Sequence, residues 1–110
     1  MKFAKNLEYQ IEISEMAEYQ LKQILLYIQY ILRNPIAARN VRRDANETKR
    51  KLTYLAGSIK LCDEPELAKR GYRVIFFKKH NYFMLYRIDG NMVYVDAIFH
   101  GLQNYQSLFK

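Results

Sequence analysis

The chain is poor in several residue types that mark particular protein classes. Its 110 residues include no tryptophan, two prolines, four glycines and one cysteine, Cys62. A lone cysteine excludes an intrachain disulfide and suits a reducing compartment. The low proline and glycine content, with half of all residues hydrophobic, excludes a low-complexity disordered chain. We therefore expect one packed globular domain over residues 1–110, with Cys62 as a small, half-buried apolar residue.

Long apolar runs and metal-ligand motifs are also absent from the sequence. No stretch approaches the roughly 18 apolar residues of a membrane span, and the N-terminal MKFAKNLEYQIEIS lacks the apolar run of a signal peptide. The cysteine and the two histidines, at positions 62, 80 and 100, do not have metal-ligand spacing. Neither a glycine-rich phosphate loop nor a nucleophile motif occurs. We expect a cytoplasmic protein that uses no metal and no cofactor.

Positive charge and tyrosine are what the chain has in excess. Eighteen lysines and arginines against eleven acidic residues give a net charge of +7, and there are ten tyrosines. Such a charge either favours a polyanionic partner, nucleic acid or an acidic protein segment, or only keeps the surface solvated. Tyrosine suits positions with one wet edge, because its hydroxyl needs a hydrogen-bond partner. The tyrosines therefore predict a half-exposed sheet or a binding surface.

Two helix-start signals predict a helical hairpin in the first half of the chain. Ser14 is suited to cap a helix over residues 15–33, whose apolar residues recur at helical spacing. Asn34 can cap a second helix, over residues 35–56, in which Pro35 takes the first position. The apolar seam of the second helix is narrow and made of small residues, so the two helices should pack closely and antiparallel.

Alternating apolar and polar residues predict the strands of a mainly antiparallel sheet. The turn signal Asp89-Gly90-Asn91 joins the last two strands as a β-hairpin. The change from helical to strand periodicity near Gly57 predicts an α+β fold, with the helices on one face of the sheet. The segment 58–69 is expected to be irregular, and 102–110 to be a short helix or irregular. The expected strands are residues 7–14, 72–79, 82–88 and 92–100.

If the Asp-Gly turn has a two-residue loop, alternation assigns each residue of the last two strands to one face. The face expected against the helices is apolar: Tyr82, Met84, Tyr86, Ile88, Val93, Val95, Ala97 and Phe99. The opposite, uncovered face mixes aromatic, apolar and charged residues: Phe83, Leu85, Arg87, Met92, Tyr94, Asp96, Ile98 and His100. A longer turn would reverse this assignment. The uncovered face is the candidate binding surface.

The charged residues of the sheet have a catalytic and a structural interpretation. His100 titrates near neutrality, so it could be a general acid or base in RNA cleavage, with Arg73 and Arg87 holding the phosphate. Alternatively, His100 ends a strand and hydrogen-bonds to backbone, and Asp96 forms a surface ion pair with Arg87. The basic second helix could contact nucleic acid or be a solvated face.

The order strand, helical hairpin and three-stranded meander resembles the RelE/ParE superfamily of toxins from bacterial type II toxin–antitoxin systems. The segments that carry the resemblance span nearly the whole chain: YQIEISEMAEYQLKQILLYI, NPIAARN, GYRVIFFKKHNYFMLYRI and AIFHGLQNY. The resemblance implies a growth-inhibiting toxin of a plasmid-stabilisation module. It also implies a cognate antitoxin, whose extended, partly acidic segment covers the open sheet face. The residues expected to bind the antitoxin are Phe83, Leu85, Tyr94 and Ile98.

The resemblance leaves two mechanisms, one enzymatic and one not. RelE-like members cleave mRNA on the ribosome with basic residues and often a C-terminal His or Tyr, which would correspond to a catalytic set of His100, Arg73, Arg87 and Tyr105. Gly101 and Phe83, however, occupy positions where such a member would carry cations. ParE-like members inhibit DNA gyrase without a catalytic site, and the long helical hairpin with NPIAARN is similar to theirs. We therefore expect a ParE-like gyrase inhibitor, with a RelE-like mRNA endoribonuclease as the alternative.

Overall fold

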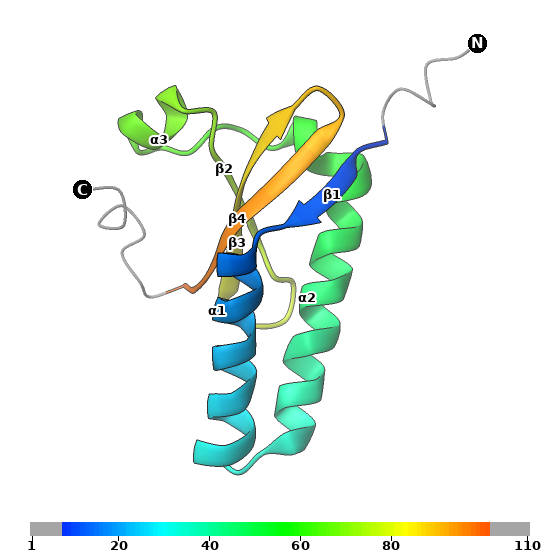
Figure 1. The fold of residues 1–110 in the computed structure, drawn as a ribbon, viewed down its shortest axis with the longest axis vertical. Coiled ribbons are helices and arrows are strands. Elements are labelled where there is room, and N and C mark those ends of the chain that lie inside the picture. The colour runs from blue at the N-terminus through cyan, green and yellow to red at the C-terminus, as the bar shows by residue number, and fades with distance from the viewer. Residues whose placement is uncertain (1–7, 102–110) are drawn as a thin grey trace.

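The computed structural model describes residues 8–101, and the expected helical hairpin is confirmed. Figure 1 shows its two long helices side by side, both extending beyond the end of the sheet. The elements in chain order are β1 (Gln10–Ile13), α1 (Glu15–Leu26), a π-helical turn η2 (Tyr27–Ile31), α2 (Pro35–Leu55), a 3-10 turn η3 (Ala56–Ser58), α3 (Pro65–Lys69), β2 (Arg73–Phe76), β3 (Tyr82–Asp89) and β4 (Met92–His100).

Side-chain caps start both long helices, as the sequence predicts. The Ser14 hydroxyl accepts a hydrogen bond from the Ala17 backbone N–H at 3.0 Å, and the Asn34 side-chain oxygen accepts one from the Ala37 N–H at 3.0 Å. Each cap satisfies an N–H group that the first helical turn leaves without a partner. The first helix differs from expectation at its end, where the π-helical turn replaces regular helix and Arg33 takes a positive φ of 54°.

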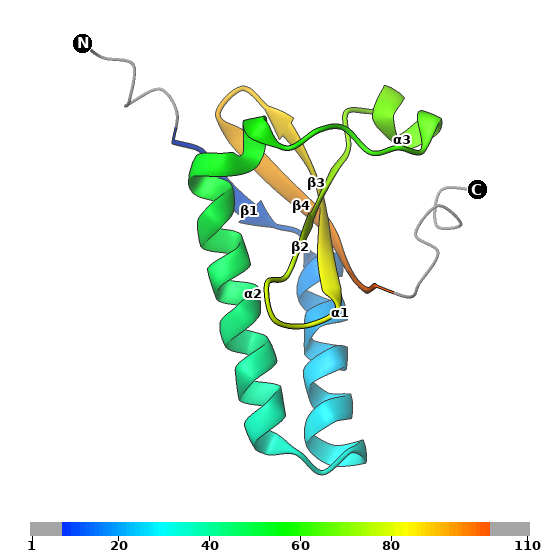
Figure 2. The same ribbon diagram turned by 180° about the vertical axis from the view of Figure 1, so that it is seen from behind.

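The four strands form one sheet in the order β1-β4-β3-β2. β1 runs parallel to β4, and the other neighbours are antiparallel. Asp89 pairs with Met92, so the turn between β3 and β4 has the expected two-residue loop, and Gly90 supplies its positive φ of 63°. Figure 2 shows the sheet from behind, with β2 at the edge opposite β1. The fold is therefore the expected α+β arrangement with a mainly antiparallel sheet.

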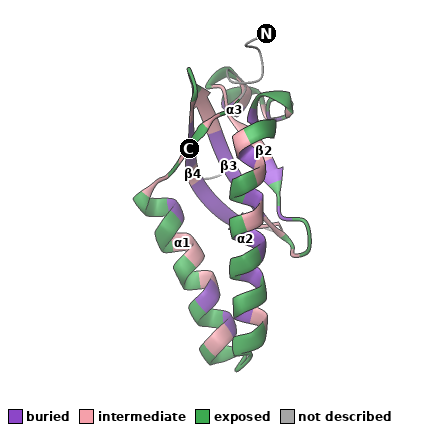
Figure 3. Cartoon of the chain, turned by 90° about the vertical axis from the view of Figure 1, so that its right-hand side faces the viewer, coloured by how far each residue is buried: buried purple, intermediate pink, exposed green. Residues whose placement is uncertain are grey.

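Apolar residues pack on both faces of the sheet, which differs from the expected one-sided core. The larger core joins the helical hairpin to the sheet and includes Leu52, Tyr86, Val93 and Val95. In Figure 3 the buried residues of α1 and α2 lie on the sides that face the sheet and each other. A second core lies on the opposite face of the sheet and is covered by the segment before β2. Its buried residues are Cys62 and Leu67 from that segment, with Phe83, Leu85, Ala97 and Phe99 from the sheet.

The short helix α3 lies in the segment that was expected to be irregular. The Glu64 carboxylate accepts a hydrogen bond from the Leu67 N–H at 3.0 Å, and Pro65 takes the first helical position. Leu67 is thereby fully buried in the second core. The sequence contains the capping residue and the proline, but a helix of five residues is too short for apolar residues to repeat at helical spacing.

A β-bulge makes the expected assignment of sheet faces wrong beyond its position. Tyr86 pairs with Val95 but Leu85 pairs with Ala97, so Asp96 is an extra residue on β4. Because one extra residue inverts the alternation that follows it, Ala97 and Phe99 lie in the second core instead of the helix-facing core. Ile98 moves the other way, into the helix-facing core.

Candidate functional site

The sheet residues expected to form a catalytic set have different surroundings. His100 pairs with Tyr82 at the end of the β3–β4 ladder, and the two rings meet edge to face with their centroids 5.2 Å apart. Tyr82 packs against the helix-facing core. Directly paired residues of an antiparallel ladder share a face, so His100 lies on the helix side of the sheet.

Arg73 is bound to backbone at the start of β2. Its guanidinium donates to the carbonyl oxygens of Ile59 and, at 3.4 Å, of Gly57. Arg73 pairs in the ladder with Tyr86, whose hydroxyl donates to the Ala56 carbonyl at 2.8 Å. Both side chains therefore satisfy carbonyl groups where the chain leaves α2 and turns toward β2. This is a structural role, because such carbonyls lose their water when the core closes.

Arg87 belongs to a polar cluster on the opposite face. Its Nε donates to an Asp96 carboxylate oxygen at 2.9 Å, and the Tyr72 hydroxyl donates to the same oxygen at 2.7 Å. The guanidinium also lies over the Tyr94 ring, 4.6 Å from its centroid. Burial, and then the hydrogen bond to Asp96, raise the pKa of the Tyr72 phenol, so it remains a donor at neutral pH. The hydrogen bond to Asp96 likewise raises the pKa of Arg87.

The structure does not bring His100, Arg73 and Arg87 together. His100 and Arg87 are on opposite faces, and their ladder positions, Tyr82 and Arg87 on β3, are five residues apart, or about 16 Å. Arg73 is on the helix side with its guanidinium engaged by backbone. Tyr105 lies outside the described residues.

Most of the residues expected to bind an antitoxin have little accessible surface. Phe83 and Leu85 are 2% and 0% exposed in the second core, and Ile98 is 2% exposed in the first. Tyr94 is half-buried beneath the Arg87 guanidinium. The bulge at Asp96 and the segment that carries α3 account for this burial. Phe76, at 63% exposed, is the large apolar side chain of β2 that remains accessible on the outer face.

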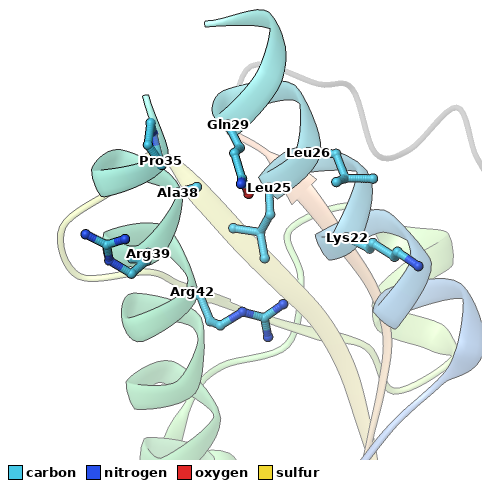
Figure 4. Close-up of a pocket in the computed structure, with 8 residues that line it drawn as sticks. All are labelled: Lys22, Leu25, Leu26, Gln29, Pro35, Ala38, Arg39 and Arg42. Atoms are coloured by element: carbon cyan, nitrogen blue, oxygen red, sulfur yellow. The ribbon is translucent and has the colours of Figure 1, made fainter. Parts of the chain in front are cut away.

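A basic groove lies between the two long helices and was not predicted from the sequence. Its volume is about 280 Å³, and its lining is Lys22, Leu25, Leu26, Gln29, Pro35, Ala38, Arg39 and Arg42. Figure 4 shows Leu25 projecting between the helices and Arg42 extending from α2 toward α1. The lining combines three cations with apolar side chains and contains no carboxylate. The sequence signal for this groove is Arg39 and Arg42, two of the cations of the basic second helix.

Exposed apolar residues continue from this groove to the tip of the hairpin. Tyr30, Ile31 and Ile36 are 64%, 65% and 61% exposed, and Tyr27 and Leu32 are also more than half exposed. A soluble monomer rarely leaves such a group of large side chains in water without a partner. The groove and the tip together offer an apolar surface with basic margins.

Groups that suggest other chemistry are few. Within residues 8–101, no three His, Cys, Asp or Glu side chains gather into a group that could hold a metal ion. None of the helices in that range is long and apolar enough to cross a membrane. Burial, with a smaller contribution from Asp63, raises the pKa of the Cys62 thiol, which disfavours the reactive thiolate.

The strand, helical hairpin and four-stranded sheet form an α+β fold that a chain of known structure shares. A solved structure with this fold is titled "Chromosomal ParDE TA system from P. aeruginosa"; one of its chains matches with a TM-score of 0.67 and 18% sequence identity. The match covers 84% of this chain and 96% of the other. No protein-family model and no curated protein matches the sequence. The likeness is therefore one of fold, over nearly the whole of both chains.

Proposed function

We propose that the chain is the toxin of a type II toxin–antitoxin module and acts in the cytoplasm as a ParE-like inhibitor of DNA gyrase. The observation that carries the proposal is the fold, which is similar to a chain of the ParDE system over most of its length. The separation of His100, Arg73 and Arg87 supports a non-catalytic mechanism. Acid–base cleavage requires a proton-transfer group and phosphate-binding cations around one reacting group.

The surface best suited to the antitoxin is the basic groove between α1 and α2. An acidic amphipathic segment would place apolar side chains on Leu25 and Leu26 and carboxylates beside Lys22, Arg39 and Arg42. Such complementarity favours fast association and rejects partners of like charge. Phe76 and the Arg87–Tyr94 pair on the outer sheet face would extend the contact of a segment that wraps around the chain.

Co-expression with the product of the neighbouring gene tests the toxin assignment. The chain alone should arrest growth, and a short partner with an acidic segment should restore it. Growth that is unaffected by high expression of folded protein would contradict the assignment.

Two purified assays test the mechanism. The chain should block supercoiling by DNA gyrase, and His100→Ala should retain that inhibition. A ribosome-dependent ribonuclease should instead lose about 10²–10⁴-fold in rate with this substitution. Codon-phased mRNA cuts that His100→Ala abolishes would overturn gyrase inhibition in favour of RelE-like cleavage, while leaving the toxin assignment intact.

A further inference from the structure

A second polar cavity lies between α2 and the loop that joins β2 to β3. Its volume is also about 280 Å³, and it shares no lining residue with the interhelical groove. The lining is Asn40, Arg43, Asp44, Glu47, Lys79 and His80. The four residues of α2 are spaced by three or four, so they lie on one face of the helix. The two residues of the loop close the cavity from the side of the sheet.

Asp44 fixes the loop and the orientation of His80. Its side chain is 1% exposed, and its carboxylate accepts hydrogen bonds from the backbone N–H groups of Lys79 at 2.9 Å and Lys78 at 3.3 Å. The same carboxylate lies 2.7 Å from Nδ1 of His80. Because an ionised carboxylate can only accept, Nδ1 carries the proton, and Nε2 is the ring nitrogen that remains for a ligand. The His80 side chain is 28% exposed and lines the cavity.

Two cations line the cavity together with the imidazole. Arg43 is positioned by a neighbour on the same helix, because its Nη1 donates a hydrogen bond to the Asn40 side-chain oxygen at 3.3 Å. Lys79 belongs to the loop whose backbone is held by Asp44. Three N–H groups donate hydrogen bonds to the Asp44 carboxylate, which stabilise its charge without cancelling it, and its side chain is only 1% exposed. Glu47 is half-buried and is therefore the more accessible carboxylate of the cavity, and its charge would repel a bound anion. Over residues 35–55, α2 has six arginines and lysines against two carboxylates, a net charge of +4.

We propose that this cavity binds a phosphate group of a nucleic-acid backbone, with Arg43 and Lys79 as its charged donors and the His80 imidazole beside them. A guanidinium and an ammonium that come from two different elements and line one cavity suit the several oxygens of a phosphate. The cavity is at the small end of the range for ligand pockets, so it fits one group of a polymer better than a large free ligand. The positive charge along α2 would attract the rest of the polyanion. This site is separate from the proposed antitoxin groove and does not depend on it.

Fluorescence anisotropy with a labelled single-stranded oligonucleotide of about 12 nucleotides, as DNA and as RNA, tests the site. Arg43→Gln and Lys79→Gln should each weaken binding roughly tenfold, the effect of losing one charge-assisted hydrogen bond. Each should also reduce the salt dependence of the affinity by about 0.7 in log–log slope. Glu47→Gln should strengthen binding, because it removes the opposing charge.

Arg50→Gln is the matched control. Arg50 is on α2 about two turns from Arg43, or roughly 10.5 Å along the axis, and lines a different cavity. Its loss removes only part of the long-range attraction along α2, so it should weaken binding about twofold, clearly less than Arg43→Gln. If Arg50→Gln weakens binding as much as Arg43→Gln, or if Glu47→Gln has no effect, binding is diffuse and the site is refuted. Absence of oligonucleotide binding at low salt would also refute it.

Inorganic phosphate distinguishes a nucleic-acid site from a site for a free anion. Imidazole signals of His80 in NMR spectra should shift on adding the oligonucleotide, and phosphate in large excess should compete. A shift with phosphate alone, without any shift from the oligonucleotide, would overturn the nucleic-acid assignment. Equal melting temperatures for all variants would show that the differences do not arise from unfolding.

Discussion

The buried Asp44 carboxylate connects α2 to the β2–β3 loop, and its removal should destabilise the protein strongly. Within residues 8–101, the buried polar or charged residues are Asp44 and Thr48. The carboxylate accepts hydrogen bonds from two backbone N–H groups and the His80 imidazole, all of them 34 to 36 residues away in the chain. Asp44→Ala removes the acceptor and leaves these three donors without a partner. It also leaves a small cavity beneath the loop.

The expected loss is about 3 kcal/mol. Hydrogen bonds to charged groups contribute roughly 1.5–3 kcal/mol each, and breaking a buried pair by removing one partner costs about 3–5 kcal/mol. The lower end applies here because His80 is 28% exposed and can be rehydrated when the loop relaxes. A loss of this size should lower the melting temperature by roughly 12 °C or more in a domain of this length.

Asp44→Asn reveals how much of this effect depends on charge and pH. Burial raises the pKa of Asp44, but the hydrogen bonds from His80, Lys79 and Lys78 outweigh it, and the net pKa lies below its ordinary value. A depressed folded-state pKa stabilises the fold above the unfolded-state value of about 3.9, and this contribution is lost as the pH falls through the folded-state pKa. The difference in unfolding free energy between wild type and Asp44→Asn should therefore have its largest value at neutral pH and decrease below about pH 4.

Urea denaturation of wild type and both variants, followed by circular dichroism, measures the effect. Asp63→Ala is the matched control, since it removes a carboxylate whose partner Lys60 is 2.8 Å away but whose side chain is 85% exposed. This control should unfold at the wild-type midpoint. An Asp44→Ala midpoint equal to that of the control would show that the loop is held by its other contacts and that Asp44 is not its anchor.

Three further substitutions have defined outcomes. Ser14→Ala removes both the cap of α1 and the hydrogen bond to the Asp96 carbonyl at 3.1 Å, and should cost about 1–2 kcal/mol in urea denaturation; an unchanged midpoint would contradict the capping role. Tyr86→Phe leaves the buried Ala56 carbonyl without its donor and should cost about 1–3 kcal/mol, with the loss absent if water replaces the hydroxyl. Arg42→Glu should weaken binding of the proposed antitoxin in calorimetry while Arg50→Glu does not; equal effects would exclude the interhelical groove as the specific surface.

Local signals in the sequence were sufficient for the helical hairpin and the β-hairpin. Ser14 and Asn34 cap the helices through contacts three residues away, and Gly90 supplies the positive φ of a two-residue turn. Such contacts are determined by neighbours in the chain, so patterns of spacing predict them. The order of these elements was enough to predict the fold class.

The bulge at Asp96 and the anchor at Asp44 depend on partners distant in the chain. Asp96 bonds through its carboxylate to Tyr72 and Arg87 and through its carbonyl to Ser14, so four segments must meet before an extra residue is accommodated there. Asp44 occupies a position in the apolar seam of α2, between Val41 and Thr48, a place where a charged side chain becomes buried. Its partners at Lys78–His80 were not identifiable from spacing.

The charged residues of the hydrophobic sheet hold the fold together, and the helices carry the more available charge. Arg73 satisfies carbonyls after α2, and Asp96 fixes the bulge with Arg87 and Tyr72. These groups are engaged within the chain, whereas the cations of α2 line several cavities and lie largely at the surface. Because charges held by internal partners have less capacity to bind an external one, the net charge of +7 acts on partners mainly through α2. In the proposals made above, the two sides of this helix bind different partners: the side toward α1 binds an acidic protein segment, and the side toward the β2–β3 loop binds a phosphate.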